Sequence, residues 1–274
     1  KKNICYINLE MLDFGFIKNY SDLDLLFKLY KSSIEPKGRV YLFIDEVQNV
    51  DGWEKLVNSY SQDYTEDIEI FISGSNSKML SGELATLLSG RYINFTIFPF
   101  SFEEYCGITK CKNDKQAYLD YLQTGGMPEL FRLKDDEVRR NYIRALKDTV
   151  MLRDIIQRYR VSDPILLDDV FSYLVNNASS IISVNNITNF FKSNLRKTSY
   201  DTISNYIGYF EDAFLVHRAE RFNIKGKEIL GGNKKYYIND LSFSNFLYKG
   251  FGYGLGYKLE NLVYLDLLRA GYDV

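Results

Sequence analysis

The stretch Val40–Gln48, VYLFIDEVQ, constrains the fold of this chain more than any other part of its sequence. It opens on an apolar run without polar alternation and ends in the adjacent carboxylates of Asp45 and Glu46. Such a run, rich in β-formers, predicts a strand buried on both faces, as in a parallel sheet covered by helices. In open α/β sheets ligands bind at the carboxyl ends of the strands, so both acids are candidate functional residues.

The acid pair has a functional and a structural interpretation. In a Walker B strand the first acid helps to hold Mg²⁺ on a nucleotide, and the second orients or deprotonates the attacking water. The alternative is that Asp45 and Glu46 only end the strand and cap the helix that follows. The functional interpretation predicts Asp45 as a metal ligand and Glu46 as a catalytic residue.

Strands and helices alternate around this stretch. Strand-like runs occur at Asn3–Glu10 and Ile68–Ser73, and a fourth follows at Ile93–Ile97. Helical segments begin near Ser21 and Asp51, between the first three of these strands. This alternation predicts a parallel sheet that is built by right-handed crossovers.

Two further segments could act on a nucleotide. Ser73 and Ser75 follow the third strand, where a hydroxyl can contact a γ-phosphate or the attacking water; a plain loop is the alternative. Arg91 precedes the fourth strand, and an arginine at a rim can neutralise transition-state charge in its own or a neighbouring subunit. The second arrangement would require a homo-oligomer. A solvated surface arginine is the alternative.

Composition excludes several classes of protein. Hydrophobic residues make up 46% and charged residues 26%, which is typical of a folded globular chain and not of a disordered one. Cys5, Cys106 and Cys111 lack metal-site spacing, which favours a reducing compartment and argues against a disulfide framework. No apolar run reaches the roughly 18 residues of a membrane span. We therefore expect a cytoplasmic protein without a membrane partner.

The later chain is more basic and more helical. Basic residues outnumber acidic ones after Lys110, and the reverse holds before it. The segment Asp136–Arg160 has helical spacing and carries a series of basic side chains, which could follow phosphates or form a solvated helix face. Gly125–Gly126 and Pro128 interrupt the helical periodicity and predict a turn.

Residues 161–240 have the pattern of a winged helix, in which three helical segments precede two strand-like segments. In that fold the helix Ser199–Asp212 would enter the major groove of DNA. Lys225, Lys227 and Lys234 would then lie on the wing, near phosphates. Many winged helices bind proteins instead, so a protein partner is the alternative.

Four motifs in order, YLFIDEVQ, FISGSNSKML, LLSGRYINFTIFPFSFEEY and LQTGGMPE, resemble a prokaryotic family of AAA-type ATPases. In that family a P-loop ATPase core precedes a conserved domain of unknown function, with a winged helix and a nuclease-like fold. The resemblance covers essentially the whole chain and implies ATP and Mg²⁺ as cofactors. It implies Asp45 as the Mg²⁺ ligand, Glu46 as the catalytic glutamate, Ser73 or Ser75 as sensor 1, and Arg91 as the arginine finger.

One part of the family pattern is missing. The family carries a Gly-rich Walker A loop ahead of the position at which this sequence begins, and no GxxxxGK[ST] motif occurs in residues 1–274. Without that loop there is neither a backbone nest for the β-phosphate nor a lysine to hold it. Because the sequence begins abruptly at the strand that should follow the Walker A helix, we expect a fragment; a degenerate ATPase is the alternative.

These inferences predict an α/β protein in four parts. They are a P-loop NTPase-like core without Walker A (1–108), a helical lid or linker (109–160), a winged-helix domain (161–240) and the start of a restriction-endonuclease-like domain (241–274). The predicted function is an AAA-type ATPase that couples ATP binding and hydrolysis to a winged-helix region, which binds DNA or a protein. The alternative is a nucleic-acid-binding regulatory module whose ATPase half is inactive.

Overall fold

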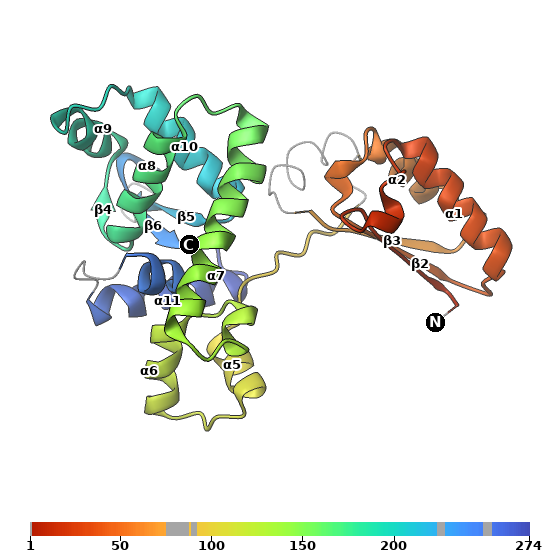
Figure 1. Ribbon diagram of the computed structural model, residues 1–274, viewed down its shortest axis with the longest axis horizontal. Helices are drawn as coiled ribbons and strands as arrows, with labels where there is room; N and C mark the ends of the chain where they lie inside the picture. The colour runs from red at the N-terminus through yellow and green to blue at the C-terminus, as the bar shows by residue number, and fades with distance from the viewer. Residues whose placement is uncertain (1, 75–87, 89–91, 224–227, 249–253) are drawn as a thin grey trace. The chain divides into compact units, whose positions relative to one another are not determined.

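The computed structural model describes residues 2–74, 88, 92–223, 228–248 and 254–274. The chain divides into two compact units, Lys1–Phe95 and Thr96–Val274 (Figure 1). Each unit has its own cluster of buried apolar side chains, and the two clusters have no residue in common. Among the described residues, no helix combines the length and the apolar character that crossing a membrane requires.

The first unit is built on a parallel sheet with the strand order β1–β2–β3 (Figure 1). Its strands and the helices that connect them are β1 (Ile4–Asn8), η1 (Leu12–Phe14), α1 (Tyr20–Ile34), β2 (Val40–Asp45), η2 (Val47–Asn49), α2 (Trp53–Gln62) and β3 (Ile68–Ile72). The predicted strands around the acid pair and the helices between them are therefore confirmed. Helix α1 begins at Tyr20, one residue before the expected start near Ser21, because the Asn19 side chain caps it by accepting from the backbone N–H groups of Ser21 and Asp22.

Among the described residues, helices cover only one face of this sheet, so the prediction that the Val40 strand is buried on both faces is wrong. Leu42 and Ile44 are buried beneath α1 and α2, whereas Tyr6 and Phe71 on the opposite face are 55% and 38% exposed. The connectivity explains the asymmetry. Two successive right-handed crossovers that advance in the same direction place both helices on the same side of the sheet. We call the other side the open face.

The expected fourth strand at Ile93–Ile97 is also wrong, because these residues form no strand. Ile93, Phe95 and Ile97 are 81%, 73% and 88% exposed. The prediction rested on β-propensity, which describes a side chain packed on a sheet and is not an intrinsic preference of the backbone. Within the described residues, β3 pairs with β2 alone and offers this segment no ladder.

The second unit opens with helices. They are α5 (Phe102–Thr109), α6 (Lys115–Thr124), the turn η3 (Pro128–Phe131), α7 (Asp136–Val150) and the π-helical η4 (Met151–Gln157). The dihedral angles at Met151 and Arg158 are right-handed, so α7 continues through η4 as one long helix, as expected for Asp136–Arg160.

Three helices and an antiparallel sheet follow. Their bounds are α8 (Pro164–Asn176), β4 (Ile181–Ile182), α9 (Val184–Ser193), α10 (Tyr200–Asp212), β5 (Val216–Asn223) and β6 (Glu228–Ile238). The short strand β4 pairs with β6, which gives the sheet order β4–β6–β5. A π-helical segment η5 (Phe243–Leu247) and helix α11 (Leu255–Arg269) complete the described chain.

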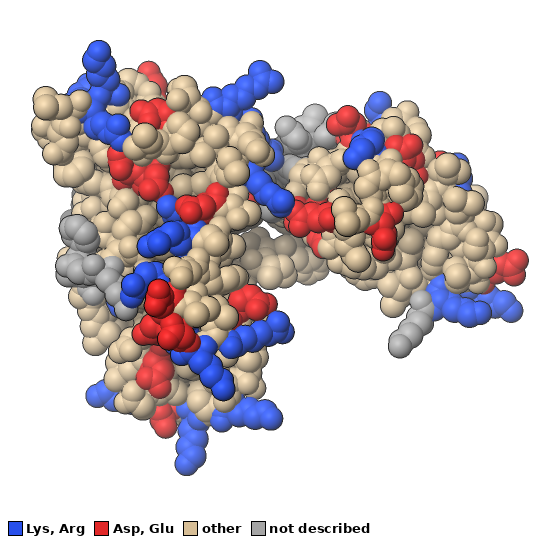
Figure 2. All heavy atoms as spheres, in the orientation of Figure 1, with Lys and Arg blue, Asp and Glu red and all other residues tan. Residues whose placement is uncertain are grey.

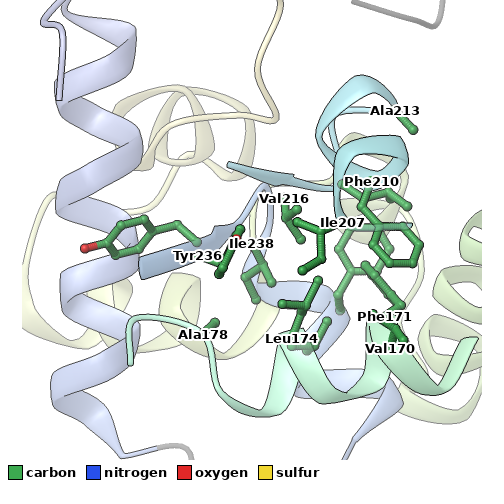
Figure 3. Close-up of a cluster of buried hydrophobic side chains, with 14 of the residues drawn as sticks. Val170, Phe171, Leu174, Ala178, Ile207, Phe210, Ala213, Val216, Tyr236 and Ile238 are labelled. Carbon is green, nitrogen blue, oxygen red and sulfur yellow. The ribbon is translucent and has the colours of Figure 1, made fainter. Parts of the chain in front are cut away.

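The helices α8 and α10 pack on this sheet through one apolar core (Figure 3). Phe171 and Leu174 of α8, Phe210 of α10 and Ile238 of β6 are all fully buried. The rings of Phe171 and Phe210 lie 5.3 Å apart, centroid to centroid. The helix, strand, helix, helix and hairpin therefore form one packed body.

Candidate active site at the carboxyl edge of the parallel sheet

Three polar side chains meet where the parallel strands end. Asn8 closes β1, Asp45 closes β2 and Ser73 follows β3. Asn8 stands opposite Asp45 in the sheet register, and the Ser73 backbone N–H donates to the Ile44 carbonyl at 3.0 Å. Because parallel strands end at the same edge, residues far apart in sequence are brought together there.

The Asp45 carboxylate accepts hydrogen bonds from both neighbouring strands. Its Oδ2 accepts from the Tyr6 hydroxyl and from Asn8 Nδ2, each at 3.1 Å, and its Oδ1 accepts from the Ser73 hydroxyl. Among the described residues, no lysine or arginine forms an ion pair with it. The neutral donors orient the half-buried carboxylate without cancelling its charge, which leaves the charge available to a cation.

Glu46 lies directly after the strand in a left-handed conformation, with φ 59° and ψ 45°. A glutamate in this region is uncommon, and such residues are concentrated at functional sites. Its Oε2 accepts from Gln48 Nε2. The turn is fixed to the third strand, because the Val47 N–H donates to the Ser73 carbonyl at 3.1 Å.

Glycine at position 74 leaves room for the Gln48 side chain. A Cβ at Gly74 would lie 2.8 Å from Oε1 of Gln48, closer than real Cβ atoms approach a neighbour. This Oε1 is buried and has no hydrogen-bond partner among the described residues. Gly74 thus lets the backbone after β3 pass close to the side chain that contacts Glu46.

The donor set of this edge fits Mg²⁺. The side-chain groups near Asp45 are carboxylate, hydroxyl and amide, and Mg²⁺ takes oxygen ligands, commonly one or two carboxylates with water and substrate phosphates. Within the described residues no group of three or more His, Cys, Asp or Glu side chains forms a metal cluster. Asp45 therefore offers Mg²⁺ a single oriented carboxylate among the described residues.

The structure brings Asp45, Glu46 and Ser73 to one edge, as the sequence predicts for an α/β sheet. Ser75 and Arg91 lie outside the described residues. Sequence reasoning missed Tyr6, Asn8 and Gln48. The signal for Tyr6 and Asn8 was present, because alternate residues of a neighbouring parallel strand share the face of the acid.

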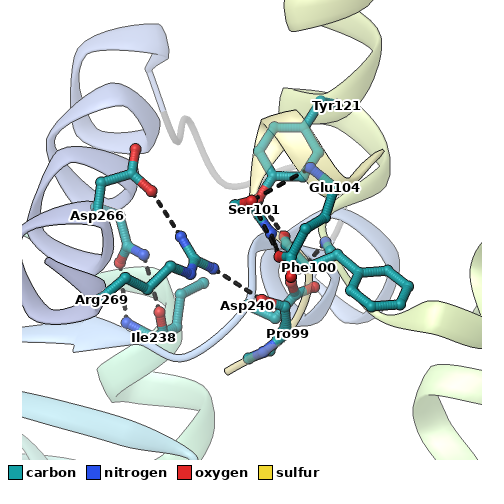
Figure 4. A network of polar contacts seen from close by, with 11 residues as sticks. Pro99, Phe100, Ser101, Glu104, Tyr121, Ile238, Asp240, Asp266 and Arg269 are labelled. Carbon is teal, nitrogen blue, oxygen red and sulfur yellow. Dashed lines mark hydrogen bonds and ion pairs between the residues drawn. The ribbon is translucent and has the colours of Figure 1, made fainter. Parts of the chain in front are cut away.

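The glycines of the GGMPE motif have a structural role, because they contact Phe100 and Asp240, both of which are labelled in Figure 4. The Gly126 N–H donates to Asp240 Oδ2 at 2.6 Å, and the Phe100 N–H donates to the Gly126 carbonyl at 2.8 Å. A Cβ at Gly125 would lie 2.3 Å from Asp240 Oδ1, and one at Gly126 would lie 2.2 Å from the Phe100 carbonyl oxygen. Burial raises the pKa of the Asp240 carboxyl. The two glycines therefore leave room for the buried carboxyl of Asp240 and for the backbone of Phe100.

The basic residues of the second unit are partly neutralised within the chain. Arg196 pairs with Asp169, and Lys234 donates to Glu220 at 2.9 Å. Lys147 is buried and pairs with Asp148 and with Asp168, so it is not part of an exposed basic stripe.

On the face drawn in Figure 2, lysines and arginines are interspersed with acids, and they do not form one continuous patch. The predicted wing residues Lys225 and Lys227 lie outside the described residues.

Comparisons with known proteins match both parts of the chain. Residues 1–106 match the family described as an AAA domain. Residues 115–253 match a domain of unknown function, DUF8612.

Two relatives, from Haemophilus influenzae and Methanocaldococcus jannaschii, both bear the name "uncharacterized protein". The first is 35% identical over 277 residues, which span all of this chain and 68% of that protein. The second is 33% identical over 286 residues, which span 99% of this chain and 62% of that protein.

A solved structure, the Aeropyrum pernix Orc1 protein in complex with DNA, aligns over 98% of this chain and 79% of its own. Its identity is 10% and its TM-score 0.35, values too low to support a structural argument. The match to the AAA domain and the parallel sheet support a P-loop NTPase-like fold for the first unit. This chain belongs to the family of its Haemophilus and Methanocaldococcus relatives, with an AAA-type ATPase module followed by DUF8612.

Proposed function

We propose that this chain supplies the metal- and water-positioning half of an ATPase site and couples ATP hydrolysis to a winged-helix region that binds DNA or a protein. The observation that supports it best is the convergence of Asn8, Asp45 and Ser73, with Glu46 adjoining, at the edge where ligands bind in α/β sheets. The AAA-domain match over residues 1–106 contains all four residues.

The proposal gives each residue a distinct role. Asp45, oriented by its neighbours, would hold Mg²⁺, which supplies charge stabilisation at the transferred phosphate when it is bound with ATP. Glu46 would accept a proton from the attacking water or orient it. Ser73 or Ser75 would contact the γ-phosphate, and Arg91 would neutralise charge that develops in the transition state.

The phosphate-binding loop is proposed to lie outside this chain. Residues 1–274 contain no GxxxxGK[ST] motif, and the chain spans 68% and 62% of the lengths of its two relatives. The activity of the whole protein is therefore part of the proposal. It predicts that ATP turnover requires both this chain and a Walker A lysine from outside it.

ATP turnover by the intact protein tests the catalytic role. We expect Glu46→Gln to lower turnover by about 10²-fold or more while Mg–ATP binding is retained, because a glutamine cannot accept the proton. Glu54→Gln, a partly exposed acid of α2 in the same unit, is the matched control and should retain full turnover. Equal rates in the Glu46→Gln variant and the wild type would contradict the assignment.

The winged-helix proposal for residues 161–240 is supported by the order helix, strand, helix, helix and hairpin, with β4 added to the edge of the hairpin. In α10, Ile203 and Phe210 face the core, whereas Asp201 and Asn205 are exposed. The exposed side of α10 is the surface that we propose for the major groove. Residues 241–274 are proposed, on resemblance alone, as the start of a nuclease-like domain.

Binding to duplex DNA at several salt concentrations tests this surface. Lys197, exposed in the turn before α10, should contribute one phosphate contact. Lys197→Ala should therefore reduce the slope of the logarithm of the binding constant against the logarithm of the salt concentration by about one. Lys112→Ala, in the loop before α6, is the control and should leave the slope unchanged. Binding that is absent, or that does not weaken with salt, would contradict a DNA partner and favour a protein.

The alternative function is a nucleic-acid-binding regulatory module with an inactive ATPase half. The absence of Walker A from residues 1–274 favours it. The two hypotheses separate in one experiment, because DNA binding by this module should be the same with and without Mg–ATP. A nucleotide-dependent change in affinity would favour the coupled ATPase.

A further inference from the structure

Two of the three thiols lie close together at the end of α5. Cys106 lies in α5 and Cys111 in the loop after it, and their Sγ atoms are 2.9 Å apart. All three cysteines are free, and Cys5 is buried in β1 of the first unit. The sequence spacing alone gives no reason to pair Cys106 with Cys111.

The chain reverses between these two cysteines. Helix α5 ends at Thr109, and Lys110 takes a left-handed conformation with φ 55°, the usual geometry of a residue that ends a helix. This reversal turns Cys111 back against the helix. The Thr109 hydroxyl donates to the Tyr105 carbonyl at 2.8 Å and fixes the last turn.

The first turn of α5 is fixed as well. Ser101 and Glu104 form a reciprocal capping box, in which the Ser101 side chain accepts from the Glu104 N–H and the Glu104 side chain accepts from the Ser101 N–H. Tyr105 packs edge-on against Phe131, with ring centroids 5.3 Å apart. Cys106 thus lies on a short helix that is held at both ends, and Cys111 lies in the loop directly after it.

We propose that Cys106 and Cys111 are a reversible thiol–disulfide site, which low-molecular-weight disulfides such as oxidised glutathione convert into an intramolecular disulfide. Both thiols are half-buried, so a small reagent can reach them. The cross-link joins atoms already in contact, and therefore needs little movement of the backbone.

The reaction balances in two exchanges. The Cys111 thiolate attacks one sulfur of the oxidant, which forms a mixed disulfide and releases one glutathione thiolate. The Cys106 thiolate then attacks the Cys111 sulfur, which forms the internal bond and releases the second glutathione. The two protons of the protein thiols end on the two released glutathione molecules, and the oxidant takes up both electrons.

The environment of Cys106 supports its place in the second step. Burial, together with the hydrogen bond between the Cys111 thiol, as donor, and the Cys106 sulfur, raises the pKa of Cys106 to about 11. A thiol with so high a pKa attacks an external disulfide slowly at neutral pH. Its contact with Cys111 compensates for this, since the second exchange takes place within one chain.

Mass spectrometry of the intact protein tests the proposal. The protein is incubated with oxidised glutathione, and the remaining thiols are alkylated after unfolding. We expect the wild type to lose two hydrogen atoms and to retain one alkylated thiol, at Cys5, with one peptide cross-link between Cys106 and Cys111. Dithiothreitol should restore three alkylated thiols.

Three variants make the result decisive. Cys106→Ser should stop at a stable mixed disulfide on Cys111, and Cys5→Ser should form the internal cross-link as the wild type does. In the wild type, the mixed disulfide should resolve about tenfold faster for each unit by which the pH rises, as long as the pH stays below the pKa of Cys106. Cys111→Ser should lack the cross-link. A wild type that keeps glutathione attached, links chain to chain, or retains three free thiols would overturn the proposal.

Discussion

His217, the only histidine of the chain, lies on β5 with a partly buried ring whose Nε2 is 2.9 Å from Asn239 Oδ1. Burial lowers the pKa of His217 below 6.5, and the nearby positive charge of Arg269 acts in the same direction. The unfolded chain therefore binds a proton more readily than the folded chain. The contribution of the neutral His217 to the free energy of unfolding is fully present above pH 6.5. It is lost as the pH falls through the lowered pKa of the folded state.

The prediction is a difference between two stability curves. The free energy of unfolding of the wild type should fall from about pH 7.5 to about pH 5 more steeply than that of His217→Gln, which cannot titrate there. Urea unfolding at each pH, with fluorescence and circular dichroism as probes, measures both. Parallel curves would show that His217 gains its proton equally in both states.

Gly126 is a residue at which one added methyl group should matter. Its Cβ would lie 2.2 Å from the Phe100 carbonyl oxygen, so Gly126→Ala has to move backbone and should cost about 1–3 kcal/mol. Gly208→Ala on α10 is the matched control, because nothing lies within 4 Å of its added Cβ. In that helix alanine should stabilise by about 0.5–1 kcal/mol. Equal effects of the two changes on unfolding would contradict the close packing at Gly126.

At the scale of single elements, helix α10 depends on its cap. The Ser199 hydroxyl accepts from the Thr202 N–H at 3.1 Å and satisfies one of the unpaired donors of the first turn. Ser199→Ala should cost about 1 kcal/mol, whereas Ser199→Asp should retain the cap and the stability. The measurement is the unfolding midpoint in urea. A loss shared by both variants would mean that Ser199 acts through something other than its acceptor oxygen.

Helices and strands could be predicted where the sequence shows both a regular spacing of apolar residues and residues that begin or end the element. The helix after Ser199 follows from its capping residue and apolar spacing, and β2 from its apolar run. The segment Ile93–Ile97 has the same propensity but forms no strand, because a strand also needs a partner, which propensity does not encode. Local patterns therefore predicted the elements, and pairing decided which of them formed a sheet.

The candidate site shows the same division. The position of Asp45 and Glu46 at the carboxyl edge of the sheet could be predicted, because the apolar run before them indicates a strand of an α/β sheet. Strand alternation places Tyr6 and Asn8 on one face, but their hydrogen bonds to Asp45 could not be predicted, because these depend on the register of β1 against β2. The register, the left-handed turn at Glu46 and the contact with Gln48 are tertiary features.

At the scale of the whole molecule, two separate cores imply two unfolding events. Leu42 of β2 and Leu174 of α8 are both fully buried, and each belongs to a different cluster of apolar side chains. Leu→Ala at such a site costs about 2–5 kcal/mol, since it removes buried methyl groups and leaves a cavity. Because each leucine belongs to one cluster only, its substitution should lower the stability of the unit that contains it and leave the other unit unchanged.

Calorimetry of the whole chain tests this independence. We expect two thermal transitions, with Leu42→Ala lowering the one that belongs to residues 1–95 and Leu174→Ala lowering the other. Hydrogen exchange assigns each transition, because the amides of β2 and of α8 should lose protection with their own unit. The open face of the first sheet exposes Tyr6 and Phe71, so this unit buries less apolar surface and should melt first. If either variant moves both transitions equally, the two units unfold as one cooperative body.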